Sequence, residues 1–349
     1  TLFDVEQVEV LRGPQGTRFG ANALAGMINI KSKAATKEAE GYVAVKASNY
    51  NTHGESAAIS GSITDNIQGR LAINSHQSDG YMENEFLNKE NTNNIDEVVA
   101  RGKLAAQLSA NTNLGLSYFY ADIDNGYDAF SLDNNRTTYS DEPGIDAQET
   151  HAFALNLDSK LNSAVILETQ LTTSKSDVEY SYDEDWAYGQ YTWISNDPDY
   201  TPDPCDTTQG PCLAATDGYS STDQYLRDYQ RNSFDIRLIS AEDGRIFEGS
   251  TDWVVGLYHQ TRSEDLVRNY TWDPQYTSTL DVTSTSLYTE LATDLSDQSR
   301  IIYGVRAEQW QNDFENSLST GSDETETLFG GQFTFETLGN KLSDFIHII

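Results

Sequence analysis

Residues 4–33 read DVEQVEVLRGPQGTRFGANALAGMINIKSK. Within this stretch, 5–11 and 27–31 alternate between polar and apolar residues, and a period of two predicts β-strands. The segment between them is rich in glycine, which tolerates positive φ and close backbone approach, and Pro14 ends strand pairing there. The glycine spacing matches neither a dinucleotide-binding fingerprint nor a Walker loop, so a phosphate-binding loop is not favoured. We expect two strands joined by a glycine-rich turn.

The same alternation recurs along most of the chain. In 286–295, SLYTELATDL, three leucines share one face and the acidic residues share the other. Each such segment has about ten residues, which suits a tilted strand that crosses a bilayer better than a soluble strand of about 5–6 residues. The expected strands are 41–50, 53–63, 67–77, 98–109, 114–124, 149–160, 163–176, 231–242, 250–263, 282–294, 299–311 and 326–336. The sequence therefore predicts an all-β fold, a partial transmembrane antiparallel β-barrel of about 12 strands.

The expected connections alternate in length from the second strand onward. The short ones are 64–66, 110–113, 161–162, 243–249 and 295–298, and the long ones are 78–97, 125–148, 177–230, 264–281 and 312–325. Alternate connections of a meander lie at opposite ends, so one end carries tight turns and the other carries large loops. This pattern is typical of outer-membrane barrels, with the long loops outside the cell. The tight link at 51–52 is the exception.

Composition narrows the class of protein. The chain has 55 Asp and Glu against 22 Lys and Arg, a net charge of −33, which argues against nucleic-acid binding because phosphates need a basic surface. Its 20 Tyr, 13 Phe and 5 Trp argue against an acidic disordered chain. No apolar run reaches the roughly 18 residues that a transmembrane helix needs. A negative mean hydropathy is compatible with a membrane barrel, whose strands show lipid only every second residue.

Motifs for catalysis are absent from the sequence. The five histidines are scattered, and no recognised nucleophile or metal-binding spacing occurs, so we expect no enzyme and no cofactor. Cys205 and Cys212 enclose Gly210 and Pro211, which favour a turn. We expect a disulfide that closes a loop tip in an oxidising compartment, and the alternative is two free thiols.

The loop 177–230 is both acidic and aromatic. We expect it to capture a ligand, with rings that stack on a sugar or a chelate; the candidate residues are Trp186, Tyr188, Tyr191 and Trp193. Asp183, Glu184 and Asp185 offer oxygens to a hard cation, but their spacing matches no known calcium loop. A solvated acidic loop without metal is the favoured interpretation.

The stretch quoted first resembles the end of the plug domain of TonB-dependent outer-membrane receptors. The family pattern is VE-V-RGPQG-T-FG-NA-GG-INI-TK, and it is matched at 8–10, 12–17, 19–20, 22–23, 26 and 28–30. Arg18 and Ala21 depart from its commonest form. The resemblance implies structural and gating roles for Arg12, Gly13, Pro14, Gly16, Gly20, Asn22 and Gly26.

The resemblance also implies an architecture. Such receptors have about 22 strands and a plugged lumen, so residues 1–36 are expected to be the C-terminal part of a plug and 37–349 a partial barrel. Arg12 is expected to pair with barrel carboxylates such as Glu168 or Glu290, the alternative being a solvated turn arginine. Both chain ends read as truncations, with no signal peptide at the first residues. The N-terminal box that contacts the TonB complex is expected to precede this stretch.

The resemblance implies energy-coupled uptake of a scarce solute, an iron–siderophore complex above others, in the outer membrane of a Gram-negative bacterium. The expected partners are outer-membrane lipid, the TonB energy-transducing complex and the solute. Three alternatives stay open: a passive porin-like channel, an acidic all-β carbohydrate-binding protein and, within the family, an importer of oligosaccharides. A plug motif before the first barrel strand argues against the porin-like channel.

Overall fold

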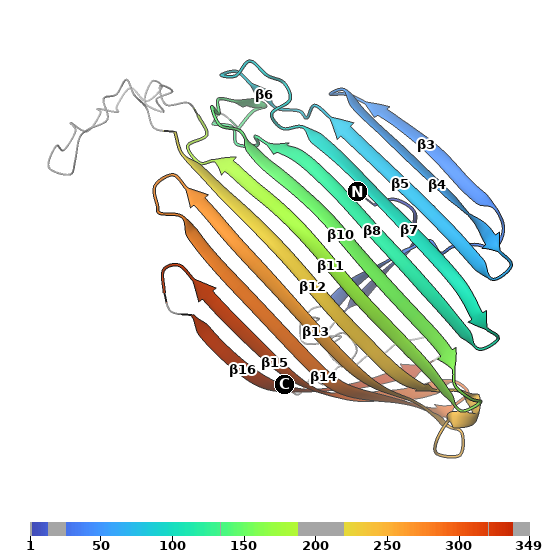
Figure 1. Cartoon of the computed structure of the whole chain (residues 1–349). Helices are drawn as coiled ribbons and strands as arrows, with labels where there is room; N and C mark the ends of the chain where they lie inside the picture. Colours follow the sequence, from blue (N-terminus) through green and yellow to red (C-terminus); the bar gives the residue numbers. More distant parts are fainter. Residues whose placement is uncertain (1, 13–25, 133, 188–219, 320, 338–349) are drawn as a thin grey trace.

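The computed structural model describes residues 2–12, 26–132, 134–187, 220–319 and 321–337. Within them, twelve strands form one antiparallel sheet whose spatial order follows the chain (Figure 1). These strands are β3 (Glu40–Ser48), β4 (Thr52–Thr64), β5 (Ile67–Ser78), β7 (Ile95–Ser109), β8 (Thr112–Tyr127), β10 (Gly144–Lys160), β11 (Val165–Asp183), β12 (Thr222–Ser240), β13 (Thr251–Tyr270), β14 (Tyr276–Ser296), β15 (Ser299–Asn316) and β16 (Ser322–Thr337). Each overlaps one expected segment, so the all-β antiparallel architecture is confirmed.

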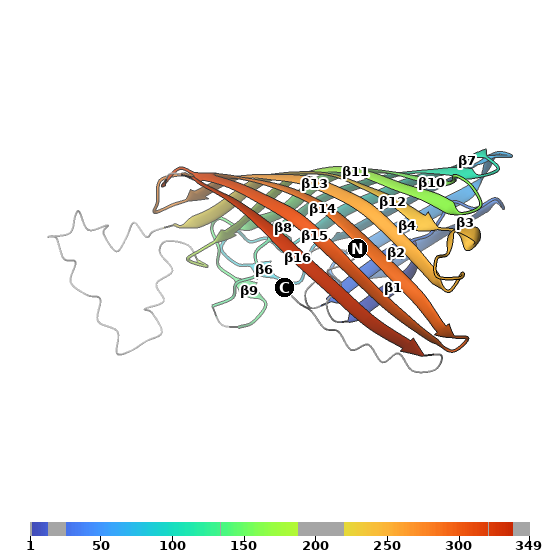
Figure 2. The ribbon, with the colours of Figure 1, turned by 90° about the horizontal axis from the view of Figure 1, so that it is seen from below.

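A second, two-stranded sheet is formed by β1 (Val5–Arg12) and β2 (Gly26–Ser32), the strands that flank the glycine-rich stretch. We call this pair the N-terminal hairpin. In Figure 2 the large sheet arches over the hairpin, which lies on its concave side. The shorter elements are β6 (Glu83–Asn84), which pairs with β9 (Thr137–Thr138), and the 3-10 helix η2 (Glu242–Gly244).

Alternate residues of the large sheet face opposite sides. In β5, Arg70 and Ala72 are buried on the concave side, whereas Leu71 is 58% exposed and Ile73 is 47% exposed on the outer side. The outward row continues across the sheet in Val43, Ile59, Leu116, Phe153, Leu171, Ile236, Leu257, Leu287, Val305 and Phe329. A sheet that is apolar outside and polar inside is typical of strands whose outer face meets lipid. No helix in the described ranges is long and apolar enough to cross a bilayer.

The hydrophobic core is small and lies where the chain before the hairpin meets the sheet. Phe3 packs against Ala58, Ala72, Val99 and Ala121, all of which are buried. Ala58 and Ala72 pair across β4 and β5. Because these side chains are small, the concave face leaves room for the phenylalanine ring at interior packing density.

The strands differ from the sequence-based expectation in length. β13 and β14 are both longer than expected. The connection between them therefore consists of residues 271–275 instead of the expected 264–281. The next expected long connection, 312–325, likewise shortens to 317–321. The link 241–250, at the opposite end of the sheet, is longer than either of these two connections. Strict alternation of loop length is therefore wrong for the second half of the sheet. Beyond the bilayer both strand faces meet water, so the polar–apolar alternation that marks a strand fades there.

Candidate functional site

Three basic residues stand together on the concave face beside the N-terminal hairpin. Strand register sets this grouping, since Arg70 on β5 pairs with Lys103 on β7, and Ala72 pairs with Arg101. Residues paired across antiparallel strands point to the same face, so the three cations share one patch. We call Arg70, Arg101 and Lys103 the basic triad.

Arg70 holds the acidic residue that precedes the hairpin. Its Nε donates to Asp4 Oδ2 at 2.8 Å, its Nη2 donates to Asp4 Oδ1, and its Nη1 donates to Glu40 Oε1 at 2.9 Å. The side chains of Arg70 and Asp4 are only 3% and 2% exposed, so this is a buried bidentate ion pair. Removing one partner of a buried pair costs about 3–5 kcal/mol because it leaves an uncompensated charge. The pair therefore fixes where the hairpin starts.

The other two cations bind the backbone of the same segment. Arg101 Nη1 donates to the carbonyl oxygen of Phe3 at 2.8 Å, and its guanidinium lies 4.7 Å from the centroid of the Phe3 ring. Lys103 Nζ donates to the carbonyl oxygens of Ser32 and Lys33 at 2.8 and 2.9 Å. Both hairpin strands are thus anchored to one patch at the end away from their turn.

Of the motif residues expected to act in gating, the structure describes Arg12 and Gly26, which pair at the turn end of the hairpin. Gly26 has φ +147°, and a Cβ there would lie 2.6 Å from the Leu11 carbonyl oxygen, which explains the glycine. Arg12 is exposed, and its expected partner Glu168 lies 3.7 Å from Arg237, so the role of Arg12 stays a prediction. The motif residues outside the described ranges are Gly13, Pro14, Gly16, Gly20 and Asn22.

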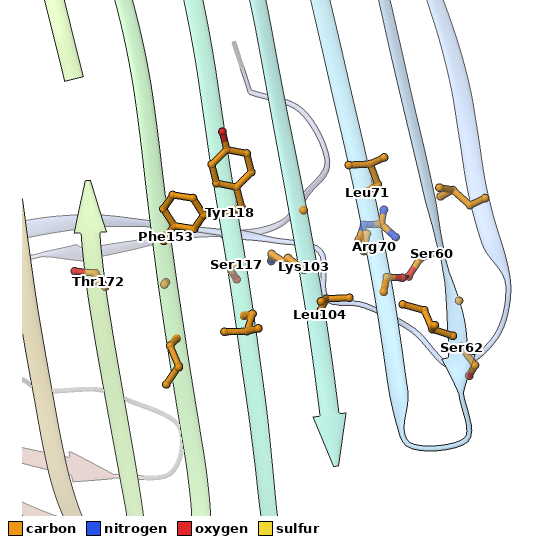
Figure 3. Close-up of a pocket in the computed structure, with 18 of the residues that line it drawn as sticks. Ser60, Ser62, Arg70, Leu71, Lys103, Leu104, Ser117, Tyr118, Phe153 and Thr172 are labelled. Carbon is orange, nitrogen blue, oxygen red and sulfur yellow. The ribbon is translucent and has the colours of Figure 1, made fainter. Parts of the chain in front are cut away.

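The outer face of the same strands carries an open apolar groove (Figure 3). Leu71 and Phe153 line it, and the ring of Tyr118 lies 4.6 Å from that of Phe153. Arg70 and Lys103, labelled in the same view, belong to the alternate set of side chains that reaches the hairpin. An open apolar surface of this kind suits lipid acyl chains rather than a polar solute.

A group of aromatic rings lies at the sheet end where β11 ends and β12 begins. The rings of Phe130 and Trp186 are stacked, with centroids 4.8 Å apart and planes at 4°. Tyr182 lies 6.0 Å from Phe130, and Tyr127 lies 5.1 Å from Tyr180. We call these five residues the aromatic platform. Trp186 is the member of the expected ligand-capturing set that the structure describes; the expected residues outside the described ranges are Tyr188, Tyr191, Trp193, Cys205 and Cys212.

A buried carboxylate ties the platform to the neighbouring strands. Asp223 is 1% exposed and accepts hydrogen bonds from Arg268 Nε and Nη2 at 2.8 and 2.6 Å. The hydroxyls of Tyr225 and Tyr182 donate to the same carboxylate at 3.0 and 3.3 Å. Burial raises the pKa of Asp223, but hydrogen bonds from Arg268 and Tyr225 outweigh it and hold the pKa below its ordinary value. The network joins the outer ends of β11, β12 and β13.

Three further carboxylates lie close together at this end. Asp141, Asp183 and Asp185 place carboxylate oxygens within 4.8 Å of one another. Burial, together with the neighbouring Asp183, raises the pKa of Asp185 to about 8. Two of the three acids expected as cation ligands thus come together, whereas Glu184 instead accepts a hydrogen bond from the Tyr270 hydroxyl at 2.8 Å.

Comparison with curated proteins gives partial sequence matches. The chain is 36% identical to the pesticin receptor of Yersinia pestis over 84 residues. This matched stretch makes up 24% of this chain and 12% of that protein. It is 26% identical to the vitamin B12 transporter BtuB of Vibrio vulnificus over 106 residues. This stretch makes up 30% of this chain and 17% of that transporter. No family model matches the chain. The matched proteins are named as a receptor and a transporter, in agreement with the expectation that the chain is not an enzyme.

Comparison with solved structures gives a match along nearly the whole chain. The ferric yersiniabactin uptake receptor FyuA from Yersinia pestis is similar with a TM-score of 0.76 at 18% identity. The match covers 97% of this chain and 50% of that chain, so this chain spans about half the length of that receptor. The similarity establishes the fold as that of an outer-membrane receptor barrel.

Proposed function

We propose that this chain is part of a TonB-dependent outer-membrane receptor and takes part in energy-coupled uptake of a scarce solute, an iron–siderophore complex. Members of the family lie in the outer membrane of Gram-negative bacteria, and the apolar outer face of the sheet suits that place. The proposed partners are the TonB energy-transducing complex on the periplasmic side and the small solute on the outside.

The observation that carries this proposal is the N-terminal hairpin held by the basic triad on the concave face. A passive channel needs an open lumen, whereas here a polypeptide segment occupies the concave side and is held there by buried charges. Such a segment has to be released before a solute passes, and release requires work. We therefore propose that residues 1–36 are the C-terminal part of a plug domain and that 37–349 belong to the barrel and its extracellular loops.

The choice of an iron–siderophore complex is supported by the relatives and by the aromatic platform. The matched solved structure is named for a ferric chelate, while one curated relative is named for vitamin B12. The stacked rings of Phe130 and Trp186 offer an apolar surface with hydroxyl groups nearby, which suits an amphipathic chelate. An importer of oligosaccharides is the second candidate, since stacked rings also suit the faces of sugars.

Uptake by cells that express the receptor tests the substrate. Cells without siderophore receptors of their own would receive the gene and be offered, separately, radioiron-loaded catecholate, hydroxamate and phenolate siderophores, labelled cobalamin and labelled oligosaccharides. We expect one siderophore class to accumulate above the empty-vector control. Accumulation of oligosaccharide or cobalamin alone would overturn the proposed substrate, and equal entry of every compound would indicate a passive channel.

A further inference from the structure

We propose that Glu40 takes over the Arg70 guanidinium when the N-terminal hairpin leaves the large sheet, and that Glu40 thereby lowers the free energy needed for release. This inference rests on the proposed function, in which the hairpin belongs to a plug that has to be displaced. The seated hairpin itself does not require a second acid at this place, since Asp4 already forms a buried bidentate ion pair with Arg70. Glu40 is therefore assigned a positioning role in release.

Two carboxylates from different parts of the chain share the Arg70 guanidinium. Asp4, which precedes the hairpin, accepts from Nε and Nη2, whereas Glu40, the first residue of β3, accepts from Nη1 at 2.9 Å. The Asp4 side chain is 2% exposed and the Glu40 side chain is 51% exposed. Glu40 therefore lies at the wet edge of the cluster, where few neighbours restrict its side chain from turning toward the nitrogens that Asp4 occupies.

Glu40 stays with the sheet when the hairpin leaves it. It pairs with Ser60 of β4, and Ser60 pairs with Arg70 of β5, so the three residues form one row on the same face of three strands. Ser60 and Arg70 are labelled next to each other in Figure 3. The segment that leads into β3 is also bonded to β4, because the Lys37 carbonyl oxygen accepts from the N–H and the hydroxyl of Ser62 at 3.2 and 2.9 Å. Release of the hairpin thus removes Asp4 and leaves Glu40 beside Arg70.

The charges of the cluster give Glu40 opposite effects on the two states. In the seated state, Asp4 and Glu40 are like charges on one guanidinium, so they repel each other. In the released state, Arg70, Arg101 and Lys103 form a patch of three cations without Asp4, and the Glu40 carboxylate offsets part of their mutual repulsion. Both effects raise the free energy of the seated state relative to the released state.

The backbone of Asp4 adds to this bias toward release. Its φ is +50°, in the left-handed region that residues other than glycine seldom adopt, and its carbonyl oxygen accepts from the N–H of Lys33 at 3.0 Å. The contacts of the seated hairpin hold Asp4 in this conformation, and release lets it relax. The ion pair with Arg70 opposes release, whereas backbone strain and the transfer of Arg70 to Glu40 favour it.

Hydrogen–deuterium exchange of the full receptor in detergent, without solute or TonB, tests the role of Glu40. Local opening of the hairpin sets the exchange rate of residues 5–12 and 26–32, so this rate reports the balance between the two states. At 0.1 M NaCl we expect Glu40→Gln to slow the exchange about threefold, the size of a partly exposed charge contact. A residue that only supports the seated hairpin would show the opposite sign, because its loss would speed the exchange.

Matched variants and salt show whether charge is the cause. Glu38→Gln removes the same charge from an exposed position two residues away and should exchange like the wild type. Glu40→Asp keeps the charge and should exchange within about twofold of the wild type. In 1 M NaCl the Debye length falls to about 3 Å, so the effect of Glu40→Gln should shrink, since Glu40 is half exposed. Heat-modifiable gel migration checks that each variant is folded.

Three results would overturn the role of Glu40: unchanged or faster exchange in folded Glu40→Gln, equal slowing in Glu38→Gln, or slowing that 1 M NaCl does not reduce. Exchange is measured without any transported solute. A receptor that takes up no solute but shows the expected exchange would therefore contradict the proposed function alone, and normal uptake with unchanged exchange would contradict the role of Glu40 alone.

Discussion

At the scale of single residues, Asp223 shows how one carboxylate stabilises the outer end of the sheet. Its folded-state pKa is lowered, so its contribution is fully present above the ordinary value of 3.8 and is lost as the pH falls through the lower folded value. Asp223→Asn would leave Arg268 without its anion. Since the Arg268 side chain is 33% exposed, solvent screens part of this loss, and we expect destabilisation of about 1–3 kcal/mol at pH 7.

Urea unfolding in detergent at pH 7 and pH 3 checks this prediction. The midpoint of Asp223→Asn should lie below that of the wild type at pH 7. The difference should shrink at pH 3, because this pH lies below the ordinary value of 3.8 and the unfolded wild-type chain then binds a proton at Asp223. Asp243→Asn, at an exposed position of η2, is the control and should match the wild type at both values. A difference that stays the same at pH 3 would contradict the assigned role of the charge.

A second prediction at this scale concerns the effect of a side chain at Gly256 on stability. A Cβ at this position would lie 2.2 Å from Tyr288 Cζ, because the tyrosine ring crosses the glycine to donate to Asp235 at 2.7 Å. Gly256→Ala should displace the ring and destabilise the barrel by about 1–3 kcal/mol. Gly102→Ala, where a Cβ would meet nothing within 4 Å, should be neutral. Equal unfolding midpoints for the two variants would show that the ring moves aside freely.

Individual contacts of the hairpin could be predicted only in part. The glycine-rich motif could be recognised from the sequence, and Gly26 has the positive φ that glycine permits. Asp4 and Arg70, by contrast, are 66 residues apart and carry no motif, so only strand register shows that they meet. Before the structure, Arg70 and Lys103 are simply the polar members of alternating strands, and nothing local distinguishes them from other strand cations.

At the scale of elements, the N-terminal hairpin depends on the basic triad. Arg70→Gln removes the cation but leaves Asp4 buried, so we expect the hairpin to detach with a loss of about 3–5 kcal/mol. Hydrogen–deuterium exchange of residues 5–12 and 26–32 should accelerate strongly. Arg262→Gln, in an ion pair of 3.7 Å with both side chains partly exposed, should change exchange little.

A double variant separates charge from packing in the same element. Asp4→Asn combined with Arg70→Gln leaves neither charge buried, so it should recover part of the protection that Arg70→Gln loses. Exchange in the double variant as fast as in Arg70→Gln would contradict the assignment of the effect to an unpaired charge.

The two faces of β11 should differ in how well they tolerate a charged residue, because only the outer face meets lipid. Leu171 points outward and is 43% exposed, while the adjacent Gln170 points to the concave side. Leu171→Arg should destabilise the barrel in detergent or bilayers by about 2–4 kcal/mol near the membrane centre and less near its surface. Gln170→Arg should be tolerated, since its paired neighbour is Asp235. Equal refolding yields in lipid vesicles for the two variants would contradict the outer-face assignment.

The number of strands was predictable because lipid on one face imposes polar–apolar alternation, as Leu171 and Gln170 illustrate. The positions at which the strands end could not be predicted in the same way, because the outer parts of β13 and β14 meet water on both faces. There Arg268 and Tyr270 build ring and ion contacts that sequence alternation does not mark. The expected loop 264–281 is for this reason mostly strand.

At the scale of the whole molecule, three features agree with the proposed receptor function: an apolar outer face, a segment anchored on the concave side and an aromatic platform at the loop end. The strongly acidic composition, with a net charge of −33, does not extend to the triad, where three cations hold the hairpin. If the N-terminal hairpin is part of a plug, as proposed, its buried charges predict that transport depends on an external source of work rather than on diffusion.

Uptake of radioiron from the siderophore panel, measured in receptor-expressing cells with and without TonB, tests this dependence most directly. We predict accumulation in cells that have TonB and background levels in cells that lack it, with surface binding of the ferric siderophore retained in both. Equal accumulation in the two strains would contradict the central claim, because it would show that the anchored hairpin opens without energy from the inner membrane.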